Sequence, residues 1–440
     1  MTMNRSSCKP IAVTSTSSPR GTIAGDVAGL FFPQLAELGL RVEATVSPRV
    51  EKKMVYAGAC ATSFEQAQND LKHLADLEIK TERIRRATTR NGKARLALTA
   101  ILEQAFLDKK LPDQLRGGPA DQDAPPIAVV MGDGGKYQRF DRNQAKPDSG
   151  SFWRESRVAC LLSMTAASYG SDPQSDLPDF LQDVSIAKKL AKIGHVPGEN
   201  PDSQKRPDKD NELPWQRGEM LSKEVIASSC NWKDFGPKVA SAAWYQGFAK
   251  ATHKVFVSDG SSAIEDLQAH WFSDYTSVLD IMHALSYCLA AARAMHSQRE
   301  AAWQCYKEFA TWIWRGKVDK VISALADAQA VMGDPPEDGG DNDPREIVRR
   351  AHVYYTNHRG RMNYPLYRQK GYPLTSSIME STVKQVSRRI KGTEKFWSSE
   401  GGEAVLQLRG DYLSDSEPMD AHWRRATTNA NGFRAYGVSA

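Results

Sequence analysis

The sequence is poor in cysteine and has no long apolar run. Its six cysteines are scattered over 440 residues without a CxxC pair, which argues against disulfides and a structural zinc site and favours a reducing compartment. No stretch approaches the roughly 20 apolar residues of a membrane-spanning helix, and the N-terminus lacks the apolar core of a secretory signal. The 58 Lys and Arg against 53 Asp and Glu are too mild an excess to name a polyanionic partner. We therefore expect a soluble intracellular protein.

A helical region precedes a Gly- and Pro-rich linker at residues 117–126. Apolar residues recur at spacings of three and four in residues 63–77, and further helices are expected over residues 81–86, with Thr81 as N-cap, and 96–111. The second helix is basic, which suggests a helix-turn-helix that binds DNA, although a solvated basic face accounts for the pattern equally well. The candidate DNA contacts are Arg83, Arg85 and Arg86.

Two short apolar runs are each followed by an Asp-Gly pair. Residues 127–131 and 254–257 have the character of buried strands, and Asp133 and Asp259 follow them. Ligand sites in open α/β sheets form just outside such strand ends, so the two carboxylates are candidates for one shared site. The ordinary alternative is that Asp-Gly forms a simple turn. The pattern alone does not distinguish the pair from other nearby acids, namely Asp141, Asp274 and Asp280.

A third candidate acid, Glu380, is expected in the first turn of a helix capped by Ser376 or Ser377. Carboxylates gathered in one cleft repel each other, so they become protonated or bind a hard cation such as Mg²⁺ or Mn²⁺. Two such ions suit attack of a water or a 3′-hydroxyl on phosphate. Cations follow Glu380 on its helix, where phosphate contacts and a solvated basic face are both open readings. These candidate DNA contacts are Lys384, Arg388, Arg389 and Lys391.

The stretch from Tyr364 to Lys384, YPLYRQKGYPLTSSIMESTVK, resembles the signature of the ISKra family of bacterial insertion-sequence transposases. The resemblance continues through RRIKG, FWSSEG and EAVLQLR in residues 388–409. Earlier pieces fall in the same order, including MGDGG at residues 131–135 and SDG at residues 258–260. Together they cover about residues 29–424.

This resemblance implies an α/β fold of the ribonuclease-H-like kind, a mixed sheet flanked by helices, with a helical N-terminal region and an all-α insertion. Carried over by position, Asp133, Asp259 and Glu380 are the catalytic ligands of two Mg²⁺ or Mn²⁺ ions. The implied activity is metal-dependent cleavage of transposon ends and strand transfer into target DNA. The expected segments are a disordered tail (1–28), a DNA-binding region (29–120), two catalytic parts (121–284 and 361–424), the insertion (285–360) and a C-terminal tail (425–440).

Asp280 and His283 resemble the companion pair that follows the second acid in this family. For His283, a packed histidine bonded to its neighbour and a role beside the metal or the scissile phosphate are both open. Asp280 is also the alternative to Asp259 as second metal ligand. The chain departs from many relatives in lacking a Cys-rich knuckle before Phe31 and in having residues 375–377 as Thr-Ser-Ser where Gly-Ser-Gly is usual.

The partners that the resemblance implies are double-stranded DNA, as terminal inverted repeats and as target, and further copies of this chain, because two DNA ends must be joined. The expected location is the bacterial cytoplasm, at the nucleoid. Two other classes stay open, a non-catalytic DNA-binding relative and a nuclease of the same fold. Loss of an acid would favour the first, and none is missing. The second uses the same metal site, so the sequence does not separate it from a transposase.

Overall fold

The computed structural model describes residues 46–140, 152–193, 218–336 and 340–430. Residues 51–423 form one compact unit, and residues 46–50 and 424–430 belong to another. The predicted tail at residues 1–28 lies outside the described residues. Of the predicted C-terminal tail at residues 425–440, residues 425–430 form the end of helix α17 (Pro418–Ala430), and the rest lie outside the described residues.

A six-stranded mixed sheet lies within residues 51–423. Its strands are β1 (Ile127–Arg139), β2 (Trp153–Met164), β3 (Met220–Ser228), β4 (His253–Ser258), β5 (Thr276–Leu279) and β6 (Phe396–Trp397). They follow the order β3-β2-β1-β4-β5, with β6 paired to the far end of β1. Neighbours among β3, β2 and β1 are antiparallel, whereas β4 is parallel to both β1 and β5. The predicted α/β class, a mixed sheet flanked by helices, is confirmed.

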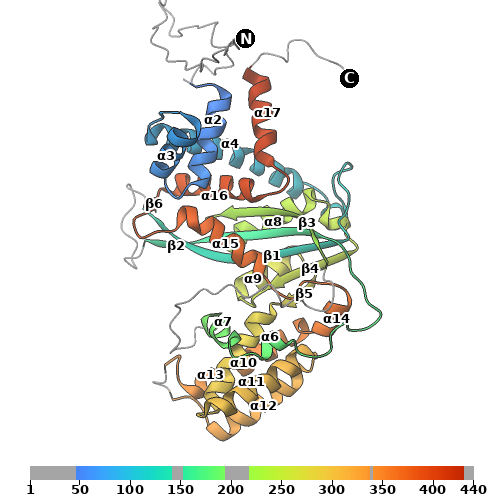
Figure 1. Ribbon diagram of the computed structural model, residues 1–440. Helices are drawn as coiled ribbons and strands as arrows, with labels where there is room; N and C mark the ends of the chain where they lie inside the picture. The colour runs from blue at the N-terminus through green and yellow to red at the C-terminus, as the bar shows by residue number, and fades with distance from the viewer. Residues whose placement is uncertain (1–45, 141–151, 194–217, 337–339, 431–440) are drawn as a thin grey trace, which may run out of the picture. The chain divides into compact units, whose positions relative to one another are not determined.

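Both faces of this sheet are buried, because alternate residues of β1 enter two separate apolar clusters. Val129 and the residues of its parity belong to the cluster that also contains residues of α10 and α15. Val130 packs on the opposite face with α8 and α9. Figure 1 shows α15 crossing strands β1 and β2, which it contacts. The bounds of these helices are α8 Trp232–Tyr245, α9 Ser262–Trp271, α10 Ile281–Met295 and α15 Ser377–Ile390.

Helices fill the chain between β5 and α15. Helix α10 packs against α11 and α13, and α12 packs against α13 (Figure 1). Two short helices, α6 and α7, follow β2, and their Leu181 and Leu190 are buried in the cluster that contains Val129. The bounds are α6 Asp179–Gln182, α7 Ile186–Ile193, α11 Arg299–Trp314, α12 Val318–Met332, α13 Pro344–His358, η2 Arg359–Arg361 and α14 Tyr364–Gln369.

The N-terminal helices correct two predictions. The helices expected over residues 81–86 and 96–111 are one helix, α4, and it ends at Leu107. Gly92 lies within this helix. A Cβ at this position would lie only 2.5 Å from the Ala404 carbonyl oxygen, so the glycine leaves room for the close approach of helix α16. Thr81 is not the N-cap; Lys80 precedes the helix, and the Thr81 hydroxyl donates to Gln68 Oε1. The bounds are α2 Pro48–Cys60, α3 Phe64–Ala75, α4 Thr81–Leu107, α5 Leu111–Arg116, η1 Phe248–Lys250 and α16 Ser399–Leu413.

Two ion pairs of contrasting burial join α4 to α16. Arg95 donates to both carboxylate oxygens of Asp411, at 2.8 and 3.2 Å, and both side chains are buried. Lys93 contacts Glu400 at 2.5 Å, and both of these side chains are exposed. Removing one residue of the buried pair leaves the other charge unpaired in the interior. Removing one residue of the exposed pair leaves the other charge in contact with water.

We expect Arg95→Ala to lower the free energy of unfolding by about 3 kcal/mol, whereas Lys93→Ala should cost less than about 1 kcal/mol because water screens that pair. Chemical denaturation measures both. The double variant Arg95→Met/Asp411→Leu should recover most of the loss. Equal losses for Arg95→Ala and Lys93→Ala would contradict this account of the α4–α16 contact.

Candidate active site

Asp133 and Asp259 lie at the same level of two adjacent parallel strands. The last paired residues of β1 and β4 are Met131 and Val257, and each aspartate follows its paired residue by two positions. The prediction that β1 ends before Asp133 is wrong, because β1 continues along β2 as far as Arg139. Asp133 is nonetheless beside the carboxyl end of β4, since its parallel partner stops there. The two predicted acids therefore both lie at the carboxyl end of the parallel pairing between β1 and β4.

Asp133 points to the face of the sheet that α15 covers, since it shares the parity of Val129 and Met131. Helix α15 approaches β1 closely here. A Cβ at Gly135 would lie 3.2 Å from Ser387 Oγ and 3.5 Å from Val383 Cγ1. A glycine at this position leaves room for the helix, and Val383 and Ser387 of α15 therefore lie over β1 two residues beyond Asp133. Among the described residues, the Asp133 carboxylate accepts one hydrogen bond, from the Gly134 N–H at 2.6 Å.

Asp259 occupies a tight turn that helix α13 supports. Its Oδ1 accepts from the Ser261 N–H at 2.9 Å. Gly260 has φ +90°, which L side chains rarely adopt, and a Cβ there would lie 2.9 Å from His358 Nε2. The Tyr354 hydroxyl donates to the Asp259 carbonyl oxygen at 3.0 Å. The backbone that carries Asp259 is thus held by the helical segment that follows β5.

Glu380 lies in the first turn of α15, as predicted, and Ser376 precedes that helix as its N-cap residue. Ser376 does not use its hydroxyl to cap α15. Both its N–H and its hydroxyl donate to Asp280 Oδ2, at 2.7 and 2.5 Å. Lys384 Nζ lies 3.6 Å from Glu380 Oε2 on the exposed side of the helix. The start of α15, and with it Glu380, is therefore fixed by a residue almost one hundred positions earlier.

Asp280 is a buried structural carboxylate. Its side chain is 1% exposed, and its second oxygen, Oδ1, accepts from the Met282 N–H at the start of α10. Burial raises the pKa of Asp280, but the neighbouring His283 and the Ser376 hydrogen bonds outweigh burial and lower it. Both oxygens of Asp280 accept hydrogen bonds, whereas only one oxygen of Asp259 does so among the described residues. This difference favours Asp259 over Asp280 as the second ligand, and the assignment stays a prediction.

His283 stands between the buried Asp280 and the carboxylate site. Its Nδ1 lies 3.7 Å from Asp280 Oδ2, and the side chain is 26% exposed. Burial lowers the pKa of His283, but contact with Asp280 and the charges of Asp259 and Glu380 outweigh burial and raise it. His283 is thus neither a fully packed core residue nor distant from the acids. It supplies positive charge to the site as the pH falls.

The charges of two other predicted acids act on Asp133. The pKa of Asp133 is raised to about 6, mainly by burial and also by the charges of Asp259 and Glu380, against the lowering effects of the Gly134 hydrogen bond and His283. Within the described ranges, however, no three His, Cys, Asp or Glu side chains are already grouped closely enough to hold a metal ion. The charges of Asp259 and Glu380 thus act on Asp133, although these side chains do not form a ready-made metal site.

The predicted basic contacts of α15 divide into two groups. Lys384, Arg388 and Lys391 are exposed. Arg389 is only 2% exposed; its guanidinium packs over the rings of Phe64 and Trp397 and donates to the Gly58 carbonyl oxygen at 2.9 Å. The prediction that Arg389 contacts DNA is therefore wrong, because the side chain is enclosed by α2, α3 and β6.

The predicted basic contacts of α4 remain on the surface. Arg83, Arg85 and Arg86 are exposed. Arg85 and Arg86 both bond to Glu82, each at 2.7 Å, and these hydrogen bonds lower the pKa of Glu82 to about 2. One carboxylate thus offsets part of the positive charge of the group.

Comparison of the sequence with protein-family models gives no match, and comparison with the curated proteins gives none either. Among the described helices, none combines the length and the apolar character needed to cross a membrane.

The sequence analysis did not identify the roles of Tyr354 and Ser376. It did not single out Tyr354, and it considered Ser376 only as a helix cap. Neither role leaves a local signal, because the partners Asp259 and Asp280 are each about one hundred residues away. Ser376, which bonds to Asp280, is the position that Thr-Ser-Ser here shares with the usual Gly-Ser-Gly.

Replacing Asp280 with Asn should lower the pKa of His283, because the charge that most stabilises the imidazolium is lost. It should also lower the free energy of unfolding by about 2 kcal/mol, since one buried oxygen acceptor becomes a donor facing the Ser376 N–H. NMR titration of the His283 ring protons measures the first effect. Asp274→Asn, which changes an exposed acid, serves as the control. An unchanged His283 titration in Asp280→Asn would refute the arrangement.

Asp133→Asn should be more stable than the parent protein at pH 8. An aspartate whose folded pKa is about 6, above its ordinary 3.8, costs stability above pH 6, and this cost disappears as the pH falls to about 4. The gain should be about 1 to 3 kcal/mol at pH 8 and close to zero at pH 4. Denaturation at both pH values tests the expectation. Asp266→Asn, an exposed acid on α9, should show no such gain.

Proposed function

We propose that this protein is a metal-dependent DNA transposase that cuts the ends of a mobile element and joins them to target DNA. The observation that carries the proposal is that Asp133 lies level with the end of β4, directly before Asp259, and that the charges of Asp259 and Glu380 both contribute to its raised pKa. A carboxylate whose pKa is raised by burial and by neighbouring acids is typical of a functional site. Asp280, the acid with a structural task, is excluded from the group by its own hydrogen bonds.

The sheet supports assignment of the domain to the ribonuclease-H-like class. Three antiparallel strands are continued by two parallel ones in the order β3-β2-β1-β4-β5. The first acid lies on the central strand β1, the second directly after its parallel neighbour β4, and the third on the helix α15 that crosses β1. This order of acids along the chain and across the sheet is the one that the resemblance to the ISKra family implies.

The donor set fits Mg²⁺ or Mn²⁺. Each of the three acids has a carboxylate oxygen that accepts no hydrogen bond within the described residues. The ligands would be oxygens alone, which hard divalent cations prefer over sulfur or nitrogen. Such cations would relieve the repulsion that raises the Asp133 pKa and would activate an oxygen nucleophile for in-line attack on phosphate.

Exposed cations next to Glu380 would position the phosphate backbone. Lys384, Arg388 and Lys391 continue from the acid along α15, so a strand whose scissile phosphate reaches Glu380 passes over them. Raised positive charge on His283 would add to the same attraction. The Arg-rich part of α4 is a second candidate contact for the element ends.

The decisive test uses purified protein, Mg²⁺ or Mn²⁺ and DNA that carries the element's terminal inverted repeats. We expect cutting at the ends, and at least a thousandfold loss of cutting in Asp133→Ala, Asp259→Ala and Glu380→Ala, with end binding retained. Asp266→Ala, on the neighbouring helix, is the matched control and should cut normally. If all three variants cut like the parent, the site is elsewhere. Cutting without joining to a target plasmid would instead identify a nuclease.

A further inference from the structure

Two buried arginines near the end of α2 have only neutral partners. Arg389 of α15 is 2% exposed and Arg409 of α16 is 9% exposed. Arg389 donates to the Gly58 carbonyl oxygen and packs over the rings of Phe64 and Trp397. A buried charge without an opposite charge destabilises the folded protein, so the pair needs a physical explanation.

Both arginines act on the thiol of Cys60, the last residue of α2. Arg409 donates to Cys60 Sγ at 3.1 Å and to the Gln385 carbonyl oxygen at 3.4 Å. Burial raises the pKa of Cys60, and the charges of Arg409 and Arg389 with the Arg409 hydrogen bond lower it by less. A thiol whose pKa stays above its usual value is neutral near pH 7. Reduced Cys60 therefore leaves both positive charges unpaired.

Each guanidinium also has a nitrogen without a hydrogen-bond partner. These are Nη2 of Arg389 and Nε of Arg409, and both are closed to solvent. Lys395 adds a third cation, and its pKa is lowered by burial and by the charge of Arg389. Among the described residues, no acid interacts with any of the three. The carbonyl end of a helix carries about −0.5 elementary charge, so α2 offsets only part of this positive charge.

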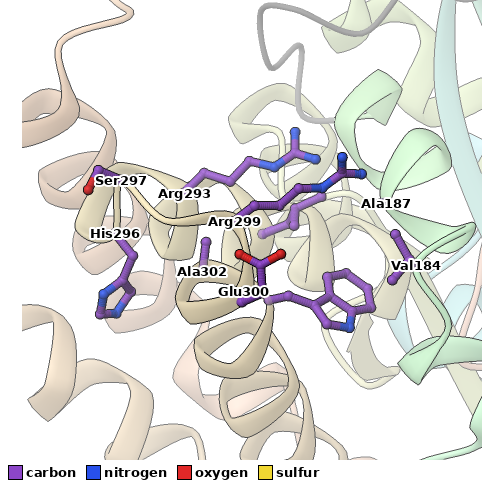
Figure 2. A pocket seen from close by; sticks show the side chains of 10 residues that line it. Val184, Ala187, Arg293, His296, Ser297, Arg299, Glu300 and Ala302 are labelled. Atoms are coloured by element: carbon purple, nitrogen blue, oxygen red, sulfur yellow. The ribbon is translucent and has the colours of Figure 1, made fainter.

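The cavity of about 530 Å³ between α7, α10 and α11 shows the opposite situation. Its lining includes Glu300 as well as Arg293 and Arg299 (Figure 2), and Arg293 already has a partner in the protein. The cluster at Cys60 has unmet charge but no open space beside its unpaired nitrogens. A free anion needs such space. An oxygen attached to Sγ needs less, because it is bonded to an atom that Arg409 already contacts.

We propose that Cys60 is an oxidation site at which a peroxide converts the thiol to a sulfinate, and that Arg389 and Arg409 bind the sulfinate oxygens. The thiolate sulfur attacks one oxygen of hydrogen peroxide, an S–O bond forms, and the O–O bond breaks. The departing hydroxide takes up the proton of the thiol and leaves as water. A second peroxide adds a second oxygen in the same way, and the sulfinic acid releases its proton to solvent. Sulfur is oxidised and peroxide is reduced in both steps.

The surroundings of Cys230 are the reverse of those of Cys60, although both side chains are half-buried. Burial raises the pKa of Cys230, and the charges of Glu403 and Asp234 raise it further, against a hydrogen bond with Ser228 and the charge of Lys238. An anion formed at Cys230 would be repelled by Glu403. Cys230 is therefore the matched control. The other cysteines of the described residues are buried, namely Cys160, Cys288 and Cys305.

The first test treats the full chain with hydrogen peroxide and locates the added oxygen atoms by mass spectrometry. We expect Cys60 to gain two oxygens at least about fivefold more often than Cys230, because cations favour both the thiolate and its anionic product. In Arg409→Gln this excess should fall by at least about half. Arg388→Gln removes the same charge from the exposed face of α15 and should leave the excess unchanged.

The second test replaces the sulfinate with a carboxylate, so that no oxidation step is needed. Cys60→Asp should unfold at least about 3 °C above Cys60→Asn, because a buried carboxylate pairs with both guanidinium groups and a neutral amide does not. The difference should shrink in the Arg409→Gln background. Cys230→Asp should show no advantage over Cys230→Asn, since Glu403 repels the new charge.

Preferential oxidation of Cys60, together with the advantage of Cys60→Asp over Cys60→Asn, supports the site. The proposal is overturned if Cys60 and Cys230 are oxidised equally. It is also overturned if Cys60→Asp is no more stable than Cys60→Asn while both keep the circular dichroism of the parent. Both comparisons stand without Arg409→Gln, should that variant not fold. Neither uses DNA or a divalent cation, so the result is independent of the proposed function.

Discussion

Asp280 holds together the elements that carry Asp259, His283 and Glu380. Its backbone N–H donates to the Ser258 carbonyl oxygen at 2.7 Å, directly before Asp259, and its two side-chain oxygens bind the starts of α10 and α15. One buried residue thus connects the end of β4, the helix with His283 and the helix with Glu380. A buried charge is costly unless hydrogen bonds surround it, and here they do. The relative position of Asp259 and Glu380 therefore depends on Asp280.

The acids themselves destabilise the folded protein. Burial and mutual repulsion push the pKa of Asp133 to about 6, so the folded protein disfavours the charged form that a cation needs. Such a group persists only where the surroundings leave the chain no other arrangement. The surroundings include a central strand buried on both faces, and a positive-φ turn at Gly260 that Tyr354 braces. Rigidity in the sheet and helices is thus what allows repelling charges to stay close.

The sequence predicted the parts of the site that local pattern determines. The apolar runs before Asp133 and Asp259 are strands, and Glu380 begins a helix. Strand β5 was missed because four residues give too short a pattern, and β3 because it does not alternate between buried apolar and exposed polar residues, with Met220 and Leu221 exposed at its start. The sequence analysis also grouped Arg388 and Arg389 as DNA contacts. Arg388 is exposed, whereas Arg389 is enclosed by Phe64 and Trp397 from distant elements. Burial of a charged side chain is decided by packing partners, which a single sequence does not display.

The helices after β5 help to position the residues of the site. Helix α10 begins with the groups that contact Asp280, and α13 contributes the hydroxyl that holds the Asp259 turn. The stacked rings of Tyr287 and Tyr354, 3.8 Å apart, join these two helices to each other. Any rearrangement of α10 against α13 must therefore shift the support of Asp259 and the position of His283 together. A chain that kept the sheet but replaced these helices would retain the acids and lose the contacts that position them.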